Sequence, residues 1–61
     1  MTYNEIQKYL NGDCVVRNYD FEYKTEDSIL FCRDIGTQKW SYVYRIGDYE
    51  KEMEWELVGK S

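Results

Sequence analysis

The chain has 61 residues, close to the lower limit for a domain that folds on its own around a hydrophobic core. It contains seven Tyr, two Phe and two Trp but no Pro, so we expect aromatic side chains to supply much of the core of a single domain, 1–61. The net charge is −4, which disfavours direct binding to nucleic acid or to an anionic membrane, because both need clustered Lys and Arg.

The chain has no recognisable targeting or membrane segment. Its start lacks the basic and apolar regions of a signal peptide, and no apolar run approaches the length of about 20 residues that a membrane span needs. The two cysteines, Cys14 and Cys32, are too few for a disulfide scaffold. We therefore predict a cytoplasmic protein with reduced thiols, in the host cell cytoplasm if a phage encodes it.

A short helix is predicted at the start of the chain. Thr2 and Glu5 have the spacing of a capping box. Three apolar residues then fall on one helical face: Tyr3, Ile6 and Leu10. Asn11-Gly12 is predicted to end the helix through a left-handed residue.

After Cys14 the apolar period changes to two, which indicates strands. Four strands are predicted, over 19–24, 29–35, 40–46 and 49–57, with a turn at 25–27 after the first. Gly36-Thr37 and Gly47-Asp48 both fit two-residue hairpin loops with glycine at the first central position. The first loop pairs Phe31 with Tyr42, and the second pairs Trp40 with Trp55 as a cross-strand pair in the core.

The predicted fold is therefore α+β, with a short N-terminal helix packed on the aromatic face of a four-stranded antiparallel β-meander. The last element has two interpretations. Tyr49, Met53 and Leu57 also have helical spacing, and Gly59 could cap a helix there. The alternative is an α-βββ-α arrangement with a C-terminal helix over 49–58.

Residues for catalysis or metal binding are scarce. Without His, the chain lacks the commonest general base and the Ser-His and Cys-His nucleophile pairs. Neither cysteine belongs to a CxxC motif, and Asn18-x-Asp20-x-Glu22 lacks the glycine and the distal glutamate of a calcium loop. We expect no enzymatic activity, no metal and no cofactor.

A row of acidic residues is the unusual feature of the sequence. Four glutamates alternate along the last predicted strand: Glu50, Glu52, Glu54 and Glu56. On a strand they would share one face at a spacing of about 6.6–6.8 Å. Asp20, Glu22 and Asp34 would widen this surface if the first strand lies beside it. We predict that these carboxylates bind a protein with a basic surface; the alternative is a charged edge strand that only prevents aggregation.

In size, charge and strand-borne carboxylates, the chain resembles a class of small acidic proteins that occupy the nucleic-acid groove of an enzyme and that phages use against host nucleases. The resemblance implies an inhibitor that acts as a DNA mimic, for example against a nuclease or a CRISPR effector. The competing hypothesis is a small adaptor or subunit that binds its partner through exposed aromatic side chains, with a homodimer as one of its forms.

Overall fold

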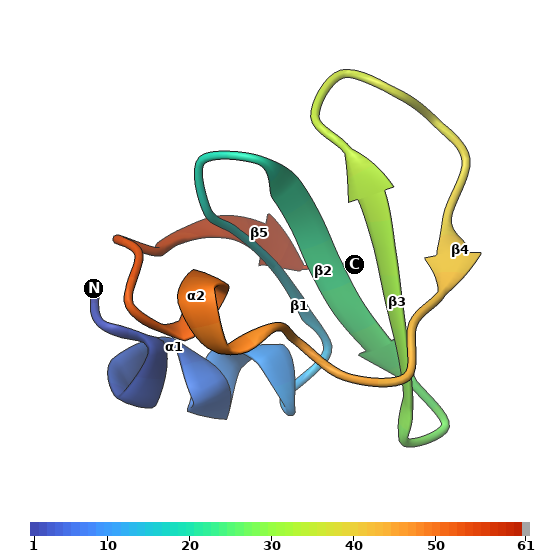
Figure 1. Ribbon diagram of the computed structural model, residues 1–61. Helices are drawn as coiled ribbons and strands as arrows, with labels where there is room; N and C mark the ends of the chain where they lie inside the picture. The colour runs from blue at the N-terminus through green and yellow to red at the C-terminus, as the bar shows by residue number, and fades with distance from the viewer. Residues whose placement is uncertain (61) are drawn as a thin grey trace.

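A computed structural model describes residues 1–60 (Figure 1). Within them, two short helices accompany one five-stranded antiparallel sheet of order β4-β3-β2-β1-β5. The α+β class agrees with the prediction, but the sheet has five strands where four were predicted. The elements in chain order are α1 (Tyr3–Leu10), β1 (Cys14–Arg17), β2 (Phe21–Glu26), β3 (Ile29–Asp34), β4 (Ser41–Tyr42), α2 (Asp48–Lys51) and β5 (Glu56–Lys60).

The predicted first helix is confirmed as α1, together with its capping box. Thr2 Oγ1 accepts a hydrogen bond from the Glu5 backbone N–H at 3.2 Å, and Glu5 Oε1 accepts one from the Thr2 N–H at 2.8 Å. Ile6 and Leu10 are buried against the sheet, as their spacing predicted. The left-handed residue after the helix is Asp13, with φ 64°, and not the predicted glycine.

Strands β2 and β3 form the hairpin that the alternating pattern predicts. Their pairing runs from Phe21 opposite Asp34 to Glu26 opposite Ile29. The loop lies two residues later than the start of the predicted turn, at Asp27-Ser28, where φ is 52° and 66°. Two successive positive φ values are typical of the two-residue hairpin loops that match the twist of the sheet.

Strand β1 was not predicted, and it lies between β2 and β5. The side chain of Asn18 turns the chain from β1 into β2, because its Oδ1 accepts hydrogen bonds from the N–H groups of Asp20 (2.8 Å) and Phe21 (2.9 Å). On the other side, β5 pairs with β1 with a bulge, in which Val58 is the extra residue.

The two predicted glycine hairpins are wrong, although one register is correct. Residues 35–40 form a six-residue connection that contains Gly36 at φ 90°, yet Phe31 still lies opposite Tyr42 as predicted. Gly47 has φ −66° and precedes α2 as its N-cap. The predicted strand over 49–57 is therefore wrong up to Trp55, and the alternative C-terminal helix is also wrong beyond the four residues of α2.

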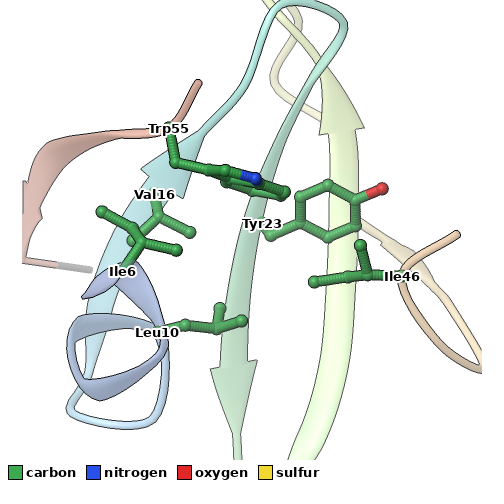
Figure 2. Packing of buried hydrophobic residues seen from close by; sticks show 6 residues of the cluster. All are labelled: Ile6, Leu10, Val16, Tyr23, Ile46 and Trp55. Atoms are coloured by element: carbon green, nitrogen blue, oxygen red, sulfur yellow. The ribbon is translucent and has the colours of Figure 1, made fainter. Parts of the chain in front are cut away.

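Helices α1 and α2 lie over the same face of the sheet, which we call the inner face (Figure 1). Figure 2 shows the core that they enclose, made of Ile6, Leu10, Val16, Tyr23, Ile46 and Trp55. Trp55 is 2% exposed, and its ring centroid lies 5.6 Å from those of both Tyr3 and Tyr23. Neither helix within 1–60 has the length and apolar character needed to span a bilayer.

The predicted Trp40–Trp55 pair is wrong, because the two indoles lie on different faces of the sheet. After β4 the chain turns into α2 and brings Trp55 back over the inner face, where its Nε1 donates to the Glu50 carbonyl at 2.9 Å. Trp40 contacts Lys24 and Arg33 on the opposite face, which we call the outer face.

Candidate binding surface

Glu50, the first residue of the predicted acidic row, is buried in the core at 6% exposure. Its Oε1 accepts hydrogen bonds from the Tyr23 hydroxyl at 2.6 Å and from Asn18 Nδ2 at 3.0 Å. Burial, together with this hydrogen bond and the carboxylate charge, raises the pKa of Tyr23 well above its usual range. Glu50 therefore joins α2 to β2 and to the β1–β2 turn, and it does not face a partner.

The other three glutamates of the predicted row do not form a line either. Glu52 is exposed at the end of α2. Glu54 is 84% exposed in its side chain and lies 3.3 Å from the N-terminal amine. Glu56 pairs with Arg17 across β1 and β5. The row needs a continuous strand over 50–56, and α2 and the bend after it replace that strand.

The three acids that were predicted to widen the row lie apart from one another. Asp20 is exposed in the β1–β2 turn, and Asp34 is exposed at the end of β3. Glu22 is 6% exposed on β2 and pairs with Arg33 at 2.7 Å. Of the seven predicted binding carboxylates, three are exposed without an ion pair inside 1–60, and they sit on three different elements: Asp20, Asp34 and Glu52.

The charged strand residues of the outer face compensate one another within the chain. The strand register places three cations and three carboxylates there, and each cation has a carboxylate partner. The pairs are Arg17–Glu56, Arg33–Glu22 at 2.7 Å and Lys24–Glu26 at 2.6 Å. The charges of these six strand residues therefore sum to zero.

Apolar side chains gather on the outer face along β3 and β4. The Trp40 ring centroid lies 4.7 Å from Lys24 Nζ and 4.3 Å from Arg33 Cζ, so two cations hold the indole against the sheet. Beside it, Phe31 and Tyr42 are cross-strand partners. The "apolar patch" is made of these three aromatic residues and one aliphatic neighbour: Ile29, Phe31, Trp40 and Tyr42. Within it, Tyr42 is 67% exposed and Ile29 is 43% exposed.

The edges of the sheet are poorly suited to pairing with another strand. Strand β4 has only two residues, and β5 is interrupted by the bulge at Val58, followed by Gly59 at φ 154°. Short and bulged edges are common ways to prevent strand addition. A partner is therefore better accommodated by a face of the sheet than by an edge.

No family model, curated protein or solved structure matches this chain. The described residues also line surface hollows of about 280–430 Å³. A surface hollow of about 330 Å³ lies beside the β1–β2 turn, at the lower end of the range for small-molecule sites, and its Arg17 and Asn18 side chains already have partners in the chain. No group of three His, Cys, Asp or Glu side chains among the described residues could hold a metal ion.

The apolar patch is the feature that sequence reasoning missed. The Phe31–Tyr42 register was predicted correctly, but these aromatics were assigned to the core. The alternation of charged residues on β2 could have revealed the patch. Glu22 and Lys24 share one face of β2, and Phe31 on β3 lies opposite Lys24 on that same face. A face that carries so many charged residues is rarely the buried one.

Proposed function

We propose that the chain is a protein-binding module that contacts its partner through the outer face of the sheet, centred on the apolar patch. The observation that carries the proposal is the compensated charge around the patch. Each charged strand residue on this face already has an ion-pair partner, so a protein that covers these strands leaves none of their charges unpaired. Aromatic and Arg side chains are also enriched at the centres of protein interfaces.

The size of the patch sets the affinity that we expect. Complete burial of an exposed large apolar side chain contributes about 1.5–3 kcal/mol, and Tyr42 and Ile29 still have much of their surface to bury. Association itself costs about 4–15 kcal/mol. A patch of four residues offsets this cost only modestly, so we expect weak or transient binding.

The test is the double variant Ile29→Ser/Tyr42→Ser, which removes apolar surface without touching the core. We expect it to lose partner binding, while exposed substitutions of this kind change stability by only about 0.5 kcal/mol. Tyr49→Ser is the matched control, because Tyr49 is 59% exposed but lies on α2. Loss of binding in the control alone would contradict the proposal.

A second candidate is the acidic inhibitor of a basic, nucleic-acid-binding site. It is supported by the net charge of −4 and by three exposed acids without ion pairs within the described chain: Asp20, Asp34 and Glu52.

Charge reversal and salt separate the two candidates. For the acidic inhibitor, Asp20→Lys/Glu52→Lys abolishes binding, and the wild-type complex weakens steeply as salt increases. For the outer-face module, the same variant binds normally and salt has little effect. Asn4→Ala/Gln7→Ala, at exposed positions of α1, serves as the control for both.

A further inference from the structure

A hollow of about 280 Å³ lies between α1 and the segment 43–47, which carries the chain from β4 back to α2 (Figure 1). Its apolar lining includes Leu10 and Ile46, two core residues that are only 5% and 3% exposed. Tyr44, which also lines the hollow, is 85% exposed. Sites for small molecules are mostly apolar and measure about 300–1,000 Å³, so this hollow suits a group no larger than one aromatic ring with a substituent.

Two cations line the same hollow, and they share one carboxylate. Arg45 Nη1 lies 3.4 Å and Lys51 Nζ lies 3.8 Å from the same oxygen, Asp48 Oδ1. Neither cation has another ion pair within residues 1–60. Two positive charges and one negative charge leave one positive charge at the hollow, although the chain as a whole carries −4. This local charge favours an anionic group.

The position of Lys51 shows which end of the hollow an anion would occupy. Lys51 Nζ lies 5.7 Å from the ring centroid of Tyr3, at the start of α1. Asn11 and Thr25 line the hollow at the other end of α1, and the eight residues of this helix span about 12 Å. Asn11 and Thr25 also border a second hollow, which is lined by two acids: Asp13 and Asp27. The anionic group therefore belongs at the Lys51 end, away from these acids.

We propose that this hollow binds an aromatic anion, with a phosphate or carboxylate between Arg45 and Lys51 and the ring against Tyr44 and Ile46. A guanidinium presents several N–H donors in a plane that matches such an anion, and the ammonium adds a second charge. Either a free small molecule or an anionic aromatic side chain of a partner protein supplies this chemistry. The proposal is independent of outer-face binding, because no residue of the apolar patch lines the hollow.

Nuclear magnetic resonance titration of the nitrogen-15-labelled protein with phenyl phosphate tests the proposal. We expect the largest chemical-shift changes at Tyr44, Arg45, Ile46 and Lys51, with a Kd of about 1–10 mM for a ligand of this size. Inorganic phosphate lacks the ring and benzyl alcohol lacks the charge, so each should bind at least about tenfold more weakly.

A pair of charge-matched variants separates a built site from general attraction to cations. Arg45→Gln/Lys51→Gln should reduce the affinity for phenyl phosphate at least about tenfold. Lys8→Gln/Lys39→Gln removes the same charge at two exposed positions outside the hollow and should bind like the wild type. Circular dichroism checks that both variants are folded.

The other outcomes are equally defined. Absence of binding, shift changes confined to another surface, or equal losses in the two double variants would overturn the proposal. Equal affinity for benzyl alcohol would overturn it too, because the cations then contribute nothing. A short peptide containing phosphotyrosine identifies the source of the ligand. Affinity at least about tenfold above that of phenyl phosphate assigns the hollow to a partner protein, and a smaller gain assigns it to a free molecule.

Discussion

Replacing the two tryptophans one at a time tests the fold most directly. Trp55 is 2% exposed between Tyr3 and Tyr23, so Trp55→Ala leaves a large cavity and should cost about 3–5 kcal/mol. Trp40 is only partly buried, and Trp40→Ala removes two cation–π contacts of about 0.5–1 kcal/mol each, or about 1–2 kcal/mol in total.

The difference between these values decides the outcome in a chain this small. At roughly 0.05–0.15 kcal/mol per residue, the total stability of 61 residues is about 3–9 kcal/mol. Trp55→Ala therefore removes most of the stability, and Trp40→Ala leaves a folded protein with a lower unfolding midpoint.

Urea unfolding followed by far-ultraviolet circular dichroism measures both variants without depending on indole fluorescence. In addition, Trp40→Phe leaves Trp55 as the single emitter, and its emission should be that of a buried indole, shifting to the red on unfolding. Equal destabilisation by the two alanine variants, or a water-exposed emission from Trp55, would refute the assignment of the indoles to opposite faces.

Three further predictions concern polar groups. Glu50→Ala leaves the Tyr23 hydroxyl and the Asn18 amide without their buried acceptor, and it should lower the free energy of unfolding by about 2–5 kcal/mol. Urea titration measures this change, and an unchanged free energy of unfolding would contradict the buried network. Because the fold raises the pKa of Tyr23, the contribution of this hydroxyl to stability is complete below about pH 10 and is lost as the pH rises further. Above pH 10 the unfolding midpoint of Tyr23→Phe should therefore fall less steeply with pH than that of the wild type. The pKa of Glu5 is lowered from 4.5, mainly by the hydrogen bond that its carboxylate accepts from the Thr2 backbone, so the contribution of Glu5 to stability is present above pH 4.5 and is lost as the pH falls. Glu5→Gln should therefore make the unfolding free energy depend less on pH in the acid range, and an unchanged pH dependence would contradict this.

Local signals in the sequence were sufficient for the elements whose contacts are also local. The capping box at Thr2 and Glu5 predicts α1 because both of its hydrogen bonds lie within one helical turn. The β2–β3 hairpin follows from alternation, since its strands are neighbours along the chain. The Phe31–Tyr42 register was correct even though the connecting loop differs, because the alternation of side chains restricts the register more than the loop does.

The parts that could not be predicted depend on contacts between distant residues. Four residues of β1 are too few to show a period, and their pairing with β5 is not visible locally. The alternating glutamates resemble an exposed strand face, and nothing near Glu50 indicates that it is buried. Its two hydrogen-bond donors, Tyr23 and Asn18, lie 27 and 32 positions earlier in the chain.

The pairing of β1 with β5 has a consequence for how the chain folds. Arg17 and Glu56, paired across these strands, are 39 positions apart, whereas β2 and β3 are joined by two residues. Non-local strand pairs form slowly, so the β2–β3 hairpin should form early and β5 should add late. Until β5 arrives, β1 is an unpaired edge that exposes Val15 and Val16, both buried in the finished fold. Because β1 is synthesised before β5, a newly made chain passes through an aggregation-prone interval that ends when residues 56–60 pair with β1.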